Sequence, residues 1–391
     1  MANYYFRNSG NVNWGTATNW SLSDGGPGDG AVPTSSDNAY FTANSGNCTV
    51  NAAARICRIL NFTGYTNTIT MNNQITASNA VTLSATMGIL GTQQLVVDGT
   101  ATHTSNGKTW PNNFVFAGSS ITHTLADDWD INGNINFSGA SVVVNGQTIY
   151  AGKGLTSSLN AGAGTTNIVF DGTGTWSTPG YYIANNLTFN TAGTITISGY
   201  VYFGRSKTIT YTAGTMVVAG STLVIALGGG ETNTLNTNGM SWNNIEMGLA
   251  GTETLSLSSL LTVNETFTNN GFGGNLTFSG AAGFSIATLD ITATGTRNLT
   301  LTHGNTYTVT TAINNRGSTS ALRTRITSSH ASNQVVLTLN QGATVECAYL
   351  NGTRIDSSGG RTIRTFGGTL TTCTNWQSFT DLLTVASTFV N

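Results

Sequence analysis

Short segments in which apolar residues alternate with Thr, Ser or Asn recur along most of this 391-residue chain, and glycine-containing turns separate them. Clear examples are residues 68–71, 121–125, 194–197 and 254–257. An alternation of period two indicates a strand with one buried face, because successive side chains point to opposite faces. Convincing helical spacing of apolar residues with capping residues is not found. The pattern therefore predicts an all-β fold.

A longer two-strand motif also recurs, in which a first short strand leads through a glycine turn to a second alternating strand. Its matching positions are Phe62, Phe116, Phe189, Met247 and Ile291, separated by 54, 73, 58 and 44 residues. Each separation fits two or three coils of roughly 18–24 residues with loops of variable length. A propeller would keep a steadier period, and a sandwich need not repeat at all. The spacing favours a β-solenoid, a coil of stacked short strands.

Composition agrees with a folded, weakly charged protein. Only 8% of residues are Asp, Glu, Lys or Arg, against about 25% in a typical globular domain. The 48 glycines do not indicate disorder, because 39% of residues are apolar and disordered chains are poor in such residues. With a formal net charge of −2, the chain offers no basic field for nucleic acid or an anionic membrane. It also has no run of about 20 apolar residues, so we expect neither a nucleic-acid partner nor membrane insertion.

Three segments are expected: an N-terminal cap or attachment segment over residues 1–47, a β-helix body of roughly 15 coils over 48–375, and a C-terminal cap or oligomer contact over 376–391. Caps are expected because the two ends of a strand stack expose unpaired backbone groups. Aromatic residues gather near both ends, and the examples are Tyr4, Tyr5, Phe6, Trp14, Trp20, Trp376 and Phe379.

The four cysteines, Cys48, Cys57, Cys347 and Cys373, form two widely separated pairs without C-x-x-C spacing. This spacing excludes a dense disulfide framework and argues against a zinc site. For Cys48 and Cys57, both a disulfide and two buried thiols are possible, and the thiols are favoured because free cysteine is often buried.

The densest acidic cluster consists of Asp127, Asp128 and Asp130 around Trp129. Carboxylates beside an aromatic ring could bind a sugar, hold calcium or act as an acid/base pair. The alternative is a solvated turn with Trp129 packed inward, which we favour. Exposed tyrosines such as Tyr181 and Tyr200 could stack on carbohydrate or form a subunit contact. These five residues are candidates for a carbohydrate or ion contact, and we expect no catalytic residue, cofactor or metal site.

Histidines and paired asparagines are interpreted as structural. The four histidines are scattered without H-x-H or H-x-x-x-H spacing, so a histidine metal site is not expected. His123 shares a strand face with Ile121 and Leu125, which predicts a partly buried polar residue. The Asn-Asn pairs at 112–113, 185–186 and 243–244 could form a stacked amide ladder inside the turns.

Both ends of the chain resemble β-helical surface proteins of bacteria and their phages. The N-terminal motif runs Trp14-Gly-Thr-Ala-Thr-Asn19-Trp20-Ser21, Gly30-Ala31-Val32-Pro33, Asp37 and Cys48-Thr49-Val50. The C-terminal one runs from Ile355-Asp356-Ser357-Ser358-Gly359-Gly360 to Asn375-Trp376. These motifs cover roughly 50 and 25 residues. The resemblance implies a single-stranded right-handed parallel β-helix used for adhesion or as a virion appendage, and it carries over no catalytic residue.

The expected function is therefore that of a bacteriophage virion structural protein: a fibre, spike or capsid decoration with an adhesive surface. Residues 1–20 lack the basic start and apolar stretch of a signal peptide, which fits synthesis in the host cytoplasm and a place on the virion surface. Expected partners are other virion proteins, copies of the chain itself (trimers first) and host-surface carbohydrate. The alternatives are a polysaccharide-degrading β-helix enzyme and a secreted bacterial adhesin or filament subunit at the cell surface.

Overall fold

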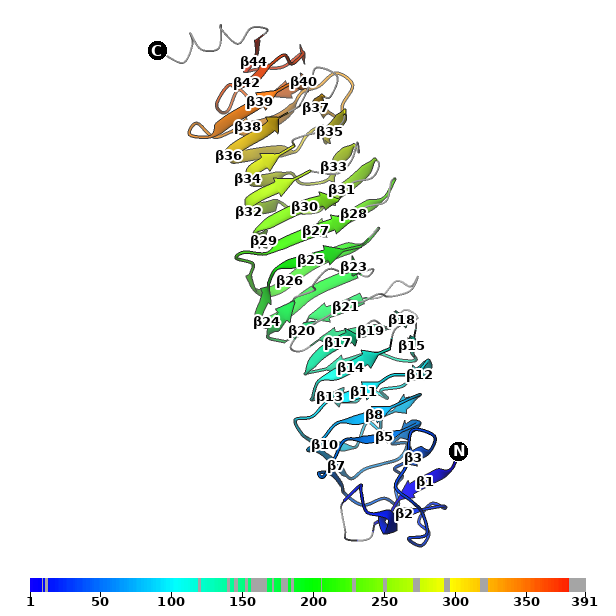
Figure 1. Cartoon of the computed structure of the whole chain (residues 1–391). Helices are drawn as coiled ribbons and strands as arrows, with labels where there is room; N and C mark the ends of the chain where they lie inside the picture. The colour runs from blue at the N-terminus through cyan, green and yellow to red at the C-terminus, as the bar shows by residue number, and fades with distance from the viewer. Residues whose placement is uncertain are drawn as a thin grey trace. The chain divides into compact units, whose positions relative to one another are not determined.

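The computed structural model describes residues 1–379 except 9, 11–12, 119–120, 139–140, 144–146, 152–153, 156–166, 171, 177–181, 184–185, 205, 227–229, 249–251, 270–274, 292–295 and 317–322. These residues form two compact units. Unit 1 contains residues 1–196 and 213–215, and unit 2 contains residues 197–212 and 216–391. Apart from the 3₁₀ turn Ala17–Asn19, the elements of the described residues are β-strands. In each unit the strands stack in ladders (Figure 1).

Unit 1 is a β-solenoid whose successive coils pair in parallel. One ladder contains β1 (Asn3–Phe6), β3 (Asn38–Tyr40), β6 (Ile59–Asn61) and β9 (Val81–Thr82), with β2 (Trp20–Ser21) antiparallel to β1. A single bridge from Thr82 to Thr104 leads on to β12 (Ala101–His103), β15 (Thr122–Leu125) and β18 (Ser141–Val143).

The other ladders of unit 1 complete each coil. One consists of β4 (Cys48–Val50), β7 (Thr68–Met71) and β10 (Gly88–Gly91). Another consists of β13 (Thr109–Trp110), β16 (Trp129–Ile131), β19 (Thr148–Ala151), β21 (Asn167–Phe170) and β24 (Asn186–Ile197). A further ladder consists of β5 (Arg55–Cys57), β8 (Ile75–Ala77), β11 (Leu95–Val97), β14 (Phe114–Ala117), β17 (Asn134–Ser138), β20 (Gly154–Leu155) and β22 (Gly174–Trp176). The strand β23 (Tyr182–Ile183) also lies in unit 1.

Unit 2 is built from two long ladders of parallel strands. The first contains β25 (Tyr200–Phe203), β27 (Thr222–Ala226), β29 (Ser241–Trp242), β30 (Asn244–Gly248), β32 (Leu261–Thr268), β34 (Phe284–Asp290), β36 (Thr306–Arg316), β38 (Val335–Leu339), β39 (Thr344–Ala348), β41 (Ile355–Asp356), β42 (Ile363–Phe366) and β44 (Trp376–Phe379). The second contains β26 (Thr208–Val217), β28 (Thr232–Asn236), β31 (Glu253–Leu257), β33 (Leu276–Gly280), β35 (Arg297–Leu301), β37 (Thr324–Ser328), β40 (Leu350–Thr353) and β43 (Leu370–Thr371).

The alternating pattern determines which side chains enter the core. In β31 the residues at positions 253, 255 and 257 are buried and those between them are not. Because paired strands keep their register, inward residues stack on inward residues of the next coil, as Leu255 does on Phe278. The sequence-based prediction of a parallel β-solenoid is thus confirmed.

The matching positions of the recurring two-strand motif do not all lie in one strand ladder of the solenoid. Phe62 follows β6 and Phe116 lies in β14, so the two residues belong to different ladders. Met247 and Ile291, in contrast, belong to the same ladder, because Ile245 pairs with Phe267 and Phe267 with Leu289. The two-strand motif recurs because each strand needs the same alternation of apolar and polar residues to bury one side, whichever face of the coil the strand forms.

Aromatic clusters lie at the N-terminus of unit 1 and near the C-terminus of unit 2, as expected. The rings of Phe6, Trp14 and Trp20 surround Phe41 over the first coil. Near the other terminus Trp376 is buried, and its Nε1 donates to the Ser357 hydroxyl at 2.9 Å. The first four residues of the predicted segment 376–391 form β44, and residues 380–391 lie outside the described part.

Gly283 lies where one coil of unit 2 runs close against the backbone of the next. A Cβ atom added to it would lie 1.8 Å from the backbone carbonyl oxygen of Thr306, whereas one added to Gly342 would meet nothing within 4 Å. We expect Gly283→Ala to cost about 1–3 kcal/mol of unfolding free energy, because the backbone must shift to relieve the overlap.

Gly342→Ala is the matched control, and we expect it to change the stability by less than about 0.5 kcal/mol. Thermal unfolding of the two variants followed by circular dichroism would test this prediction. Equal midpoints for the two variants would mean that the coils do not approach each other this closely.

Candidate functional site

The acidic cluster is tied to neighbouring coils by hydrogen bonds. The Asp127 carboxylate accepts the backbone N–H groups of Ser105 and Asn106 at 2.7 and 2.6 Å. Asp128 accepts the N–H of Thr148 on the following coil at 2.7 Å. These bonds satisfy backbone donors that the strand ladders leave open at the turns. The cluster therefore connects three successive coils.

The rest of this cluster follows the alternation of β16. Trp129 is fully buried, as predicted. Asp130 Oδ2 accepts the hydroxyl of Thr109 at 2.6 Å, while its Oδ1 is buried and has no hydrogen-bond partner among the described residues. Tyr200 begins β25 and is 58% exposed, whereas Tyr181 lies outside the described residues. A carbohydrate or ion contact at these five residues stays a prediction.

Asp127→Ala tests the structural role of the cluster. Removing two charge-assisted backbone bonds is expected to cost about 1–3 kcal/mol of local stability. Hydrogen exchange measured by mass spectrometry on the peptide that contains Ser105 and Asn106 should then become faster. Asp128→Ala is the control, because it releases only the Thr148 N–H on the other neighbouring coil. Unchanged exchange at 105–106 would contradict the proposed bonding.

The predicted amide ladder takes a different form in the structure. Asn113 Oδ1 accepts the backbone N–H of Asn134 at 2.9 Å, and Asn244 Oδ1 accepts that of Thr266 at 3.0 Å. These side chains therefore bond to the backbone of the next coil. A direct amide–amide bond occurs instead between Gln94 and Gln74, at 2.7 Å. Residue 185 of the remaining predicted pair is outside the described part.

Cys48 and Cys57 are both free and buried, which confirms the interpretation as two thiols. Burial raises the pKa of each thiol well above its usual value. Both groups therefore stay protonated at neutral pH and behave as small apolar side chains.

Sequence reasoning missed a buried pair of histidines. His103 and His123 are 20 residues apart, about one coil, and both are fully buried. The backbone N–H of Val81 donates to His103 Nδ1 at 3.2 Å, so the His103 proton is placed on Nε2. His103 Nε2 lies 3.0 Å from His123 Nδ1, and His123 Nε2 lies 3.1 Å from the carbonyl oxygen of Ala117. Every donor in this relay meets an acceptor only when both rings are neutral.

The electrostatics of the pair agree with this arrangement. Burial, with a smaller contribution from the neighbouring His123, lowers the pKa of His103 to about 3. Burial also lowers the pKa of His123, against smaller opposing effects of the Ala117 carbonyl and Asp98. The expectation that His123 is only partly buried was therefore wrong. The coil-length separation of the two histidines was the signal that could have revealed the pair.

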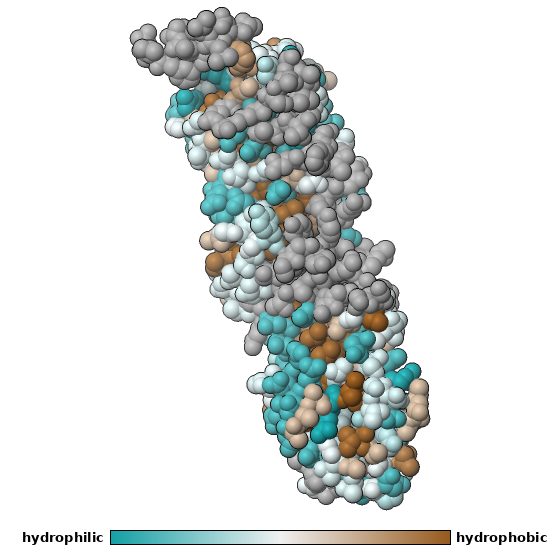
Figure 2. Space-filling view, viewed as in Figure 1, coloured by the Kyte–Doolittle hydropathy of each residue, from teal (hydrophilic) through white to brown (hydrophobic). Residues whose placement is uncertain are grey.

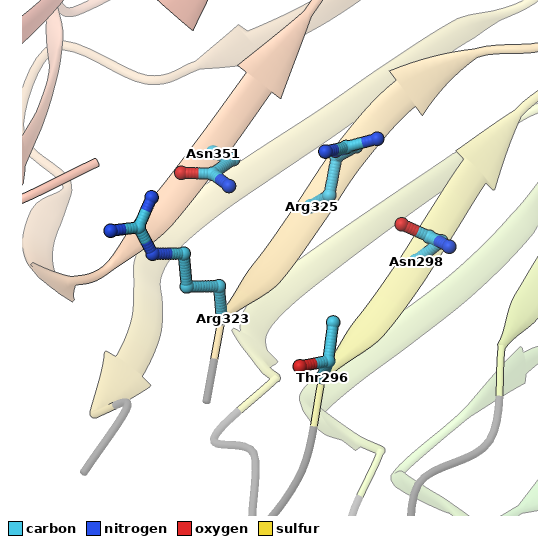
Figure 3. A pocket seen from close by; sticks show the side chains of 5 residues that line it. All are labelled: Thr296, Asn298, Arg323, Arg325 and Asn351. Atoms are coloured by element: carbon cyan, nitrogen blue, oxygen red, sulfur yellow. The ribbon is translucent and has the colours of Figure 1, made fainter. Parts of the chain in front are cut away.

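A polar cavity of about 300 Å³ lies on unit 2 and is lined by Thr296, Asn298, Arg323, Arg325 and Asn351. Three of these residues come from adjacent strands in exact register: Asn298 pairs with Arg325, and Arg325 with Asn351. Figure 3 shows their side chains projecting from β35, β37 and β40. None of the five lining residues is acidic or aromatic, so the cavity presents two guanidinium groups among neutral hydrogen-bonding groups.

The described surface seen in one view (Figure 2) is mostly hydrophilic or of intermediate hydropathy. On the face shown in Figure 2, the described residues are largely white and teal, and brown residues form small separate groups. No group of three or more His, Cys, Asp or Glu able to hold a metal ion occurs among the residues described. Within the same part of the chain, no helix has the length and apolar character needed to cross a membrane.

Comparisons with known proteins give no relative from which a function could be transferred. No family model, no curated protein and no solved structure matches the chain.

Proposed function

We propose that this protein is a rigid structural component with an adhesive surface, built into a bacteriophage virion as a fibre, spike or capsid decoration. The fold itself is consistent with a structural or adhesive protein. The observation that carries the proposal is the coil-to-coil bonding: parallel strand pairing is supplemented by side chains such as Asp127 and Asn113, which accept backbone N–H groups of the preceding and the following coil, respectively. Such a stack resists shear and proteolysis because opening one coil breaks bonds to its neighbours.

Several further features support a non-catalytic role on a particle. Only 8% of the residues are charged, which suits many weak polar contacts rather than one strong electrostatic one. The described residues that line the cavity on unit 2 include no carboxylate, whereas a glycoside hydrolase requires a pair of them. Copies of the chain, trimers first, and other virion proteins are the proposed partners.

The proposal is tested on purified particles from the source culture. Mass spectrometry should find the chain in particles banded by density, and antibody labelling in the electron microscope should place it on their surface. Sedimentation of the purified protein should give the mass of three chains. Absence of the chain from the particles would refute the virion role, and detection on the cell surface would favour the secreted adhesin.

A further inference from the structure

We infer that the cavity around Arg323 and Arg325 binds an acidic polysaccharide, whose anionic groups contact the two guanidinium groups. The inference rests on the proposed adhesive function and names the class of its receptor. It assigns the binding to Asn298, Arg325 and Asn351, a row of residues in register on adjacent strands, together with Arg323 and Thr296, all on unit 2.

The charge distribution singles out this region. Residues 297–364 contain two acidic residues, Glu346 and Asp356, while the whole chain has a net charge of −2. The same segment holds half of the 14 basic residues of the chain, namely Arg297, Arg316, Arg323, Arg325, Arg354, Arg361 and Arg364. In a protein with so few charges, two guanidinium groups in one cavity whose described lining residues include no carboxylate form a site for an anion.

The strand register determines the shape of the ligand. Asn298 is preceded in its row by Asn275, whose Oδ1 accepts the Asn298 backbone N–H at 2.9 Å. Asn351 is followed by Thr369, whose N–H donates to Asn351 Oδ1 at 2.8 Å. The row thus supplies one polar residue per coil, about 4.8 Å apart. A linear ligand that runs along the stack can meet several of these groups in turn.

The chemistry of the row favours a polysaccharide over a nucleic acid. Single-stranded nucleic acid is normally held by many cations along its phosphates and by aromatic rings on which bases stack. The described residues that line the cavity include two arginines and no aromatic residue. Amide and hydroxyl groups such as those of Asn298 and Thr296 instead match sugar hydroxyls, and the volume of about 300 Å³ is at the small end of ligand sites.

Each arginine has a distinct position. Arg325 is exposed on β37 in the middle of the row. Arg323, just before β37, extends toward the strand that carries Asn351 (Figure 3), and its Nη1 lies 3.4 Å from the Thr369 hydroxyl. Because the Arg325 side chain is exposed, it can be replaced without disrupting the fold. Arg325 is therefore the residue to substitute.

The experiment measures binding of the full chain to polygalacturonate, dextran sulfate and neutral dextran by isothermal titration calorimetry. We expect binding to at least one charged polymer and none to dextran. The two charged polymers distinguish a carboxylate from a sulfate ligand. Arg325→Gln should weaken the binding about tenfold, because a charge-assisted hydrogen bond is lost. Arg364→Gln, on β42 in the other ladder, removes the same charge and should leave the affinity within about twofold.

Three outcomes would overturn the inference: no binding to either charged polymer, equal affinities for the wild type and Arg325→Gln, or tighter Arg325-dependent binding to single-stranded DNA. Thermal unfolding of each variant confirms that the fold is intact. These outcomes leave the virion role standing, because that role is decided by the presence of the chain in purified particles.

Discussion

Replacing Phe41 with alanine is expected to cost about 3–5 kcal/mol of unfolding free energy, the largest effect of any substitution considered for unit 1. The Phe41 side chain is completely buried. The substitution removes the buried apolar surface of this ring and its contacts with neighbouring rings. The neighbouring rings are already closely packed, so they cannot move to fill the cavity that is left. Its neighbours, with ring-centroid distances of 4.8–5.6 Å, are Phe6, Trp14, Trp20, Phe62 and Tyr65.

Hydrogen exchange would show where this loss acts. We expect faster exchange in β1 and β3, because these strands close the first coil of unit 1. Leu90→Ala is the control in the same unit, since Leu90 is 60% exposed and its truncation should cost less than about 0.5 kcal/mol. Similar costs for the two substitutions would show that the aromatic cluster does not stabilise the end of the solenoid.

The second large effect is acid sensitivity caused by the His103–His123 pair. The unfolded chain binds a proton at His103 below about pH 6.5, whereas the folded protein keeps this ring neutral down to a pKa of about 3. The unfolded state therefore binds more protons in this window, so stability falls as the pH is lowered from about 6.5 toward 3. The slope for this group is about 1.4 kcal/mol per pH unit.

His103→Gln should reduce this pH dependence, because glutamine does not titrate and can still accept the Val81 N–H. Chemical unfolding measured between pH 7 and 4 would give the slopes. His303→Gln is the matched control: the His303 and His330 rings are 5.0 Å apart, close to the 5.1 Å of the buried pair, yet both residues are exposed. The interpretation fails if the two variants lose the same amount of pH dependence.

The sequence determined the class of fold because the relevant signal is local. Alternation within a strand decides which side chains enter the core, and Trp129 and His123 both lie inward as their positions require. Glycine turns at irregular intervals indicated coils of about 20 residues, which the separation of Gln74 and Gln94 illustrates. The aromatic residues near the N-terminus were also recognised as a cap, because the end of a strand stack must be covered.

Only the tertiary structure decided which residues meet across coils. Partners are separated by one coil length, and loops change that length: it is 20 residues between His103 and His123 but 27 between Asn298 and Arg325. A difference of one residue moves a side chain to the opposite face. The histidine relay, the bonds of Asp127 and the arginine cavity all depend on this register. The alternation within each strand is encoded locally, whereas the register between strands is set by the packing of the whole coil.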